Sequence, residues 1–204
     1  MGLYERLVLP RVINLACSGG DIERQRRAVV PHAAGRVLEV GMGPGLTLPF
    51  YDPSRVEFVW GLEPNDGMRT VVAGRIEQAS VEVRWLDLPS EEIPLDDDSV
   101  DTVVLTYTLC SITDWERALD QMRRVLKPDG QLLFAEHGES PDESVRRWQH
   151  RIDPVWTRLA GGCHITRRIP DLIERGGFHI DHLEEGYLPG PRISAFQSWG
   201  HAHL

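Results

Sequence analysis

Three glycines at alternate positions form the chemically most specific segment of the chain. Gly41, Gly43 and Gly45 follow a short apolar run, and Glu39 lies two residues before the first of them. Because glycine has no β-carbon, such a loop lets the backbone approach a ligand closely. Loops that hold a pyrophosphate at a helix N-terminus space their glycines as G-x-G-x-x-G. Here the third glycine comes one residue early, and the Glu39 carboxylate would repel a pyrophosphate, which favours a cationic ligand.

Two more acidic residues follow the next two strand-like runs. Glu63 comes directly after residues 57–62, and Asp87, followed by Leu88, comes directly after residues 81–86. A carboxylate at the end of the second strand can accept hydrogen bonds from both hydroxyl groups of a ribose. One acid at a strand end is usually only solvated, whereas acids at three consecutive strand ends indicate a ligand site.

A set of strands that alternate with helices must position these residues. Short β-branched runs, typical of buried strands, cover residues 36–41, 57–62, 81–86, 100–105 and 131–135, and two closing strands cover about 178–188 and 193–200. Capping residues and helical spacing predict helices over residues 21–31, 113–126, 140–159 and 166–175. This alternation predicts an α/β fold with a mostly parallel sheet and a ligand site at the C-terminal ends of its strands.

Composition and charge narrow the class of protein further. The chain has 204 residues and a net charge of −9, which is the wrong sign for a protein that binds nucleic acid through its phosphates. Cys17, Cys110 and Cys163 form no CxxC pair and are expected to be reduced thiols of a cytoplasmic protein. The apolar residues 7–17 are interrupted by polar residues and proline, so we interpret them as an amphipathic segment rather than a signal.

The glycine loop and the acids after it resemble the class I S-adenosylmethionine-dependent methyltransferases. That family carries E/D-x-G-x-G-x-G after its first strand, and its cofactor has a sulfonium and an α-amino group but no phosphate. The resemblance covers about residues 36–200 and implies a Rossmann-like, seven-stranded, mostly parallel sheet with an antiparallel last strand and helices on both faces. It implies S-adenosylmethionine as the cofactor, bound by Glu39, Gly41, Gly43, Gly45, Glu63, Asp87 and Leu88.

Five further segments look like the thiol and phospholipid methyltransferase-like group. They are residues 48–51, 109–111, 136–137, 153–156 and 162–167. This resemblance implies a small-molecule acceptor, with a thiol or a similar soft nucleophile as the first choice. A phospholipid amine or a quinone is the alternative acceptor. Two alternative classes of protein are a nicotinamide oxidoreductase and a non-catalytic cofactor-binding protein.

Methyl transfer depends mainly on alignment of donor and acceptor, and a general base is needed only if the nucleophile arrives protonated. His137, which follows the fifth strand and can titrate near neutrality, is the first candidate for that base. Asp153 and Tyr107 are the other catalytic candidates, and Cys110 and His164 lie in the same part of the sequence. Alternatively, His137 only caps a loop, and Asp153 pairs with a nearby arginine.

No metal site is expected, because Cys163, His164, His179 and His182 match no zinc-binding spacing. Trp148 and Trp156 are interpreted as core residues of the long helix. The stretch 144–168 carries six arginines and one aspartate. This stretch is either a solvated helix or a basic surface for an anionic substrate or lipid headgroup, so contact with a membrane surface is one of the two interpretations. The sequence predicts no particular oligomeric state.

Residues 1–35 precede the first strand and are predicted to form a helical lid, while residues 36–204 form the cofactor-binding domain. The apolar residues of this segment have no partner in the sheet itself: Leu7, Val8, Leu9, Val12, Ile13 and Leu15. A lid would exclude water from the transferring methyl group. The alternative is that the segment packs on an outer face and only adds stability.

Overall fold

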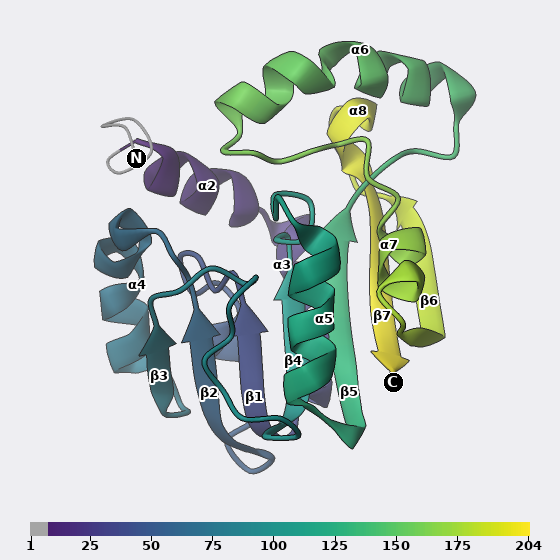
Figure 1. Ribbon diagram of the computed structural model, residues 1–204. Coiled ribbons are helices and arrows are strands. Elements are labelled where there is room, and N and C mark those ends of the chain that lie inside the picture. The colour runs from purple at the N-terminus through teal and green to yellow at the C-terminus, as the bar shows by residue number, and fades with distance from the viewer. Residues whose placement is uncertain (1–7) are drawn as a thin grey trace.

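A seven-stranded sheet in the order β3-β2-β1-β4-β5-β7-β6 forms the centre of the molecule (Figure 1). The computed structural model describes residues 8–204. The strands are β1 (Gly35–Val40), β2 (Val56–Leu62), β3 (Val83–Leu86), β4 (Val100–Thr106), β5 (Leu126–His137), β6 (His179–Tyr187) and β7 (Phe196–His203). All neighbouring strands are parallel except β7, which is antiparallel to both β5 and β6. The predicted Rossmann-like sheet with a reversed last strand is therefore confirmed.

The central strands are rich in valine and leucine because both faces of the sheet are covered. Leu38 of β1 and Val103 of β4 belong to one apolar cluster, and their neighbours Val37 and Val104 belong to a second one. The first cluster includes residues of α5 (Trp115–Val125) and α7 (Ile169–Arg175). The second includes residues of α3 (Gly20–Val29), the 3-10 turns Val30–His32 and Leu48–Phe50, and α4 (Asp66–Gln78).

The segment after the glycine loop contains a single 3-10 turn, Leu48–Phe50, before β2 begins. Pro49 has no backbone N–H and cannot donate to a helical ladder. The sequence predicts that Pro49 shortens the helix at this point, and in the structure the helix is reduced to one turn.

Several elements begin or end away from their predicted positions. Asp114 rather than Thr113 caps α5, since its side chain accepts a backbone N–H at 3.1 Å. Helix α6 (Glu143–Leu159) begins after Asp142, because the Ser140 hydroxyl accepts the Asp142 amide at 3.0 Å in a turn before the helix. Helix α7 begins at residue 169 rather than 166, and the short helix α8 (Arg192–Ala195) lies between the two closing strands.

Helices α2 (Leu9–Cys17) and α6 lie on the side of the sheet toward which β1, β2 and β4 point (Figure 1). Polar contacts hold α6 in place: the buried Gln149 side chain donates to the carbonyl oxygens of Gly138 at 3.1 Å and Ile193 at 3.0 Å, and accepts the Ser140 amide at 2.9 Å. Trp148 is 57% exposed, so its predicted core position is wrong. None of the described helices combines the length and the apolar composition that a membrane span requires.

Candidate active site

A cavity of about 710 Å³ lies at the C-terminal ends of β1, β2 and β4. The glycine loop and Glu63 form one part of its wall. Helix α2 contributes Leu9, Ile13 and Cys17, and the end of α6 with the following turn contributes Thr157, Arg158, Gly161 and Gly162. Sites for small molecules usually have volumes of roughly 300–1,000 Å³. The cavity therefore has the size and the place in the fold that a cofactor with its acceptor requires.

The three glycines adopt left-handed backbone conformations, which other residues rarely take. Their φ angles are +67° at Gly41, +53° at Gly43 and +73° at Gly45. A β-carbon on Gly41 would lie 2.3 Å from the Thr108 side chain, and one on Gly45 would lie 2.6 Å from a side chain of α4. A β-carbon on Gly43 meets no atom within 3.5 Å; its nearest neighbour is a backbone oxygen at 3.8 Å. Packing thus requires two of the glycines, whereas Gly43 leaves space in the cavity wall.

Glu63 lies at the end of β2, lines the cavity and also fastens the glycine loop. One carboxylate oxygen accepts the Gly43 amide at 3.0 Å, and the other accepts the Asn65 amide at 2.9 Å. The residue is 9% exposed, and burial raises the pKa of its carboxyl group. A carboxylate has about four lone-pair sites. Glu63 can therefore keep both backbone contacts and still accept hydrogen bonds from a ligand in the cavity.

Glu39 lies behind the loop and is absent from the described lining of the cavity. Its carboxylate accepts hydrogen bonds from the hydroxyls of Thr47 and Tyr51, the latter at 2.9 Å. Burial raises the pKa of Glu39 to about 7, although the two hydroxyl donors oppose this effect. In the structure Glu39 braces the loop from within the core, and its direct contact with a cofactor stays a prediction.

Asp87 and Leu88 follow β3 but do not line the cavity among the described residues; the next residues, Pro89, Ser90 and Glu91, do. Asp87 is exposed, and its negative charge adds to the raised pKa of Glu63. The two carboxylates are thus close enough for their charges to interact. Contact of Asp87 and Leu88 with a nucleoside stays a prediction.

Tyr107 lines the cavity directly after β4 and has a φ angle of +58°. Its hydroxyl donates to Gln25 of α3, and the Arg26 guanidinium lies 5.1 Å from its ring centroid. Burial raises the pKa of the phenol well above its usual value. Tyr107 is therefore a neutral wall residue near neutral pH, which makes it a poor general base.

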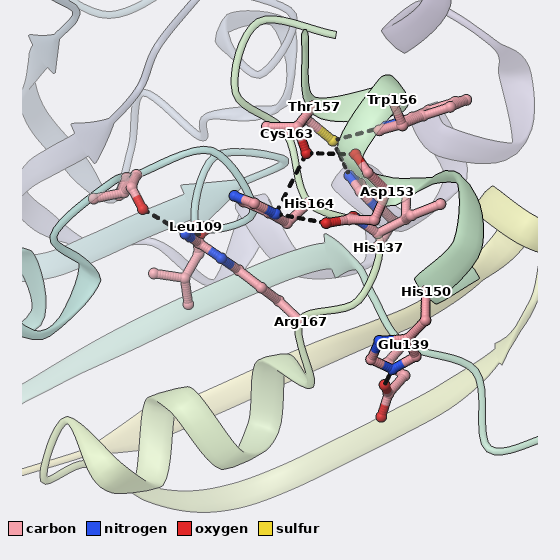
Figure 2. Close-up of polar contacts among 12 residues, drawn as sticks. Leu109, His137, Glu139, His150, Asp153, Trp156, Thr157, Cys163, His164 and Arg167 are labelled. Atoms are coloured by element: carbon pink, nitrogen blue, oxygen red, sulfur yellow. Dashed lines mark hydrogen bonds and ion pairs between the residues drawn. The ribbon is translucent and has the colours of Figure 1, made fainter. Parts of the chain in front are cut away.

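His137 and Cys163 form a half-buried pair behind this wall (Figure 2). The Cys163 sulfur lies 3.1 Å from His137 Nε2 and 3.4 Å from the Trp156 indole nitrogen. A hydrogen bond from Cys110 and the charge of His137 lower the pKa of Cys163 to about 4 against the opposing effect of burial. His137 stacks at 6.4 Å on Tyr107 but does not itself line the cavity among the described residues. Its role as a base stays a prediction.

Asp153 of α6 holds the segment that carries Cys163. Its carboxylate accepts the Ile165 amide at 2.9 Å and lies 2.8 Å from His164 Nδ1 (Figure 2). The side-chain partner described for Asp153 is thus a histidine rather than the arginine named in the alternative interpretation. Asp153 does not line the cavity among the described residues, and its predicted catalytic role is untested.

Sequence reasoning missed Arg26, which reaches the cavity from α3. The residue is only 4% exposed, and its guanidinium donates to the Cys17 carbonyl oxygen at 2.7 Å. Within residues 8–204, no carboxylate forms an ion pair with it, and its Nε has no hydrogen-bond partner. An arginine in a polar helix normally indicates a solvated face, so the sequence carries no signal for this position.

Comparisons with known proteins agree with this fold. Residues 38–134 match the family model of a methyltransferase domain. The thiol S-methyltransferases TMT1B of Rattus norvegicus and Homo sapiens are 34% and 35% identical over 152 and 174 residues, which are 72% and 79% of this chain and 62% and 70% of theirs. A demethylmenaquinone methyltransferase of Clavibacter sepedonicus is 31% identical over 173 residues, 85% of this chain and 66% of that protein. The crystal structure of YcgJ from Bacillus subtilis has 20% identity and a TM-score of 0.64 over 81% of this chain and 72% of that one.

The sheet order, the glycine loop and the acid after β2 define a Rossmann-like methyltransferase. The chain belongs to the class I S-adenosylmethionine-dependent methyltransferase family. The matched segments span about two thirds of the length of the thiol S-methyltransferase relatives. S-adenosylmethionine is the cofactor of this family, and the residues present fit it. The open space beside Gly43 and the free acceptor capacity of Glu63 match a nucleoside with two ribose hydroxyls.

Proposed function

We propose that this chain methylates the sulfur of a small thiol. The observation that carries the proposal is the buried guanidinium of Arg26, which lines the cavity with no carboxylate at ion-pair distance among the described residues, the charge of Glu39 acting on it only from farther away. A buried cation favours a ligand that can become an anion. A thiol has a pKa of about 8.5 and ionises near neutrality far more readily than an alcohol. The names of the relatives that are thiol S-methyltransferases support the same acceptor class.

The chain's own residues would align the two reactants. S-adenosylmethionine, when bound, supplies an electrophilic methyl group on a sulfonium. Glu63 and the glycine loop hold the nucleoside, and Arg26 stabilises the acceptor as a thiolate whose proton passes to water. The bound cofactor would supply its methyl group to the thiolate sulfur and would leave as S-adenosylhomocysteine, and the role of Arg26 would be to hold the sulfur of the acceptor in its anionic form. Alignment of this kind can supply about 7–11 kcal/mol. An acceptor that is bound as a thiolate needs no general base, because its proton has already passed to water.

An acceptor panel tests the proposal. The purified chain is incubated with S-adenosylmethionine and matched alkyl and aryl thiols, amines and phenols, and release of S-adenosylhomocysteine is measured. Thiols should give the highest kcat/KM. Arg26→Met should lower kcat/KM for thiols at neutral pH by about tenfold or more, while Arg158→Met, which removes a second cavity arginine, should have a smaller effect. Preference for an amine or a phenol over every thiol would contradict the proposal.

The second candidate acceptor is a lipid-soluble quinone. A phospholipid amine, which would also be presented by a membrane, is the other acceptor of this kind. Apolar side chains on α2 and α6 are exposed beside the cavity: Val12 at 48%, Leu15 at 78%, Val155 at 59% and Leu159 at 64%. Arginines of α6 accompany them. Such a surface suits contact with a bilayer, and the demethylmenaquinone methyltransferase relative supports a quinone. Turnover of a short-chain demethylated quinol but of no thiol would favour this candidate.

We further propose that α2 acts as the lid predicted for residues 1–35. Leu9, Ile13 and Cys17 of this helix line the cavity. Leu9 is buried, whereas Val12 and Leu15 on the other side of α2 are exposed. Leu7, also expected to contribute, lies outside the described residues. A closed α2 would exclude water from the reacting atoms.

A further inference from the structure

Three metal-binding side chains from three separate segments meet behind the cavity wall. Cys110 follows β4, His137 ends β5, and Cys163 follows α6. The two sulfurs and a ring nitrogen of His137 all lie within 4.8 Å of one another. The closest described approach is 3.1 Å, between Cys163 Sγ and His137 Nε2 (Figure 2). In a tetrahedral zinc site the ligand atoms lie about 3.3–3.8 Å apart, given zinc–ligand distances of about 2.0–2.3 Å. Small side-chain movements would therefore complete such a site.

Backbone contacts outside the cluster fix these segments in place. The His164 amide donates to the Cys110 carbonyl oxygen at 2.9 Å, which ties the two cysteine segments together. The Glu136 carboxylate accepts the amides of Thr108 at 2.6 Å and Leu109 at 2.9 Å, which ties the loop after β4 to the end of β5. None of these contacts uses a side chain of the cluster. The three ligand atoms are thus held together by the fold itself.

The charges around the cluster favour a cation. Glu136 is fully buried, and its second carboxylate oxygen has no hydrogen-bond partner among the described residues. The Trp156 indole N–H points at the Cys163 sulfur at 3.4 Å, as expected for a donor that orients a thiolate ligand. Arg167 is already close enough to Cys110, Glu136 and Cys163 to interact with their charges. A divalent ion would add the positive charge that two thiolate ligands need once Cys110 gives up its proton.

We propose that Cys110, His137 and Cys163 bind a Zn²⁺ ion. Thiolate and imidazole ligands suit zinc, and sites with three protein ligands keep a fourth position for water or a substrate. The cluster lies next to the cavity wall, because Ser111 and Gly162, the neighbours of the two cysteines, line the cavity. A His137 ring that binds zinc through Nε2 would not act as the general base. The site differs from the set of Cys163, His164, His179 and His182 considered from sequence, because His179 and His182 lie on β6, the edge strand farthest from β1.

A cobalt titration tests this site without reference to methyl transfer. The reduced, metal-free protein is titrated with Co²⁺ under anaerobic conditions, and the absorption spectrum is recorded. We expect one equivalent to give a thiolate-to-cobalt charge-transfer band and the visible bands of a tetrahedral site, and Zn²⁺ to abolish both. Cys163→Ser and Cys110→Ser should each weaken Co²⁺ binding by more than tenfold.

Cys17→Ser is the matched control, because Cys17 lines the cavity but is not part of the cluster. It should leave the cobalt spectrum unchanged. Titration of every variant with S-adenosylhomocysteine shows whether the variant is folded. If a cysteine variant does not fold, His137→Gln replaces it as the test of the cluster. The proposal would be overturned if the wild-type protein gave no charge-transfer band. It would also be overturned if several equivalents of Co²⁺ bound weakly and the cluster variants did not change that binding. Either result leaves the acceptor panel unaffected, so the two proposals fail separately.

Discussion

Glu63 has two roles in the site. Its carboxylate accepts the Gly43 amide and also lines the cavity, where its remaining lone pairs can accept hydrogen bonds from a ligand. Hydrogen bonds to a charged group are worth about 1.5–3 kcal/mol each. Glu63→Gln should therefore weaken binding of S-adenosylhomocysteine by at least about tenfold in calorimetric titration. Glu91→Gln, at another acid that lines the cavity, is the control and should change affinity less. Unchanged affinity of Glu63→Gln would remove this residue from the cofactor site.

Gly43 is the glycine of the loop whose β-carbon position is open. Gly43→Ala introduces a methyl group at a φ of +53°, which costs about 1–2 kcal/mol of backbone strain. We expect a moderate fall in Tm and a loss of cofactor affinity of more than tenfold, because the methyl group occupies space beside Glu63. Gly74→Ala, in the exposed part of α4 with no atom near its β-carbon position, is the control and should retain binding. Full cofactor binding by Gly43→Ala would show that the loop is an ordinary turn.

Glu39 links the loop to the pH dependence of stability. Its pKa rises from 4.5 to about 7 on burial, so the folded chain binds this proton more tightly than the unfolded chain. The stabilisation that results is complete below about pH 4.5 and is lost as the pH rises through about 7. Glu39→Gln cannot ionise and should gain stability relative to the wild-type protein between about pH 5 and pH 8, by up to a few kcal/mol.

Thermal unfolding of both proteins across this pH range measures the effect of Glu39. Glu77→Gln, at an exposed residue of α4, should follow the wild-type curve at every pH. A Tm difference between Glu39→Gln and wild type that stays constant with pH would contradict the interpretation.

The sequence predicts the residues of the site only where their chemistry depends on local spacing. The glycine loop and Glu63 are found in this way, because strand ends and left-handed turns have local signals. The cluster of Cys110, His137 and Cys163 has none, since its members are brought together by three separate segments. Glu39 shows a further limit: its position before the glycines is visible in the sequence, but its orientation into the core depends on Thr47 and Tyr51.

At the scale of elements, the lid proposed for α2 predicts that loss of this helix affects catalysis more than stability. Deleting residues 1–18 removes this helix, which supplies cavity wall through Leu9, Ile13 and Cys17. If α2 is a lid, the truncated chain should lose at least about tenfold in kcat through access of water to the site, while Tm and cofactor affinity change much less. Steady-state kinetics with a thiol acceptor, calorimetry and thermal unfolding measure the three quantities.

Two point variants control for the truncation. Ile13→Ala alters the cavity side of α2, and Leu15→Ala alters a residue that is 78% exposed. The first should lower kcat several-fold and the second should not. The lid hypothesis would be contradicted if truncation lowered activity and Tm in parallel. Normal turnover of the chain without α2 would also contradict it.

Helices were predicted less completely than strands, for identifiable reasons. The pattern of α4 gives no apolar stripe, because only Met68 and Val72 of this helix are buried, and the helix is missed. In α6 the apolar stripe is real, but it faces solvent, since the buried polar side chain of Gln149 holds the helix on α8 and the loop after β5. Amphipathic spacing indicates a helix correctly and cannot show what covers its apolar side.

At the scale of the whole molecule, the sheet was predictable because consecutive buried strands and short crossovers leave few topologies. Helices α2 and α6, which carry exposed apolar residues, lie on the side of the sheet toward which β1, β2 and β4 point (Figure 1), and both helices contribute residues to the cavity wall. An apolar surface beside the cavity is compatible with both proposed acceptors, a small aqueous thiol and a lipid-soluble quinone. The acceptor therefore has to be identified from the product.

Mass spectrometry of the methylated product tests the central claim most directly. The chain is given S-adenosylmethionine with a deuterium-labelled methyl group and an equimolar mixture of a small thiol, a demethylated quinol and a primary amine. We predict that the label appears on the thiol sulfur, in one-to-one ratio with the S-adenosylhomocysteine released, and that Glu63→Gln reduces both in parallel. Label on the quinol or the amine with none on sulfur would contradict thiol methylation, and absence of label on every acceptor would contradict it equally.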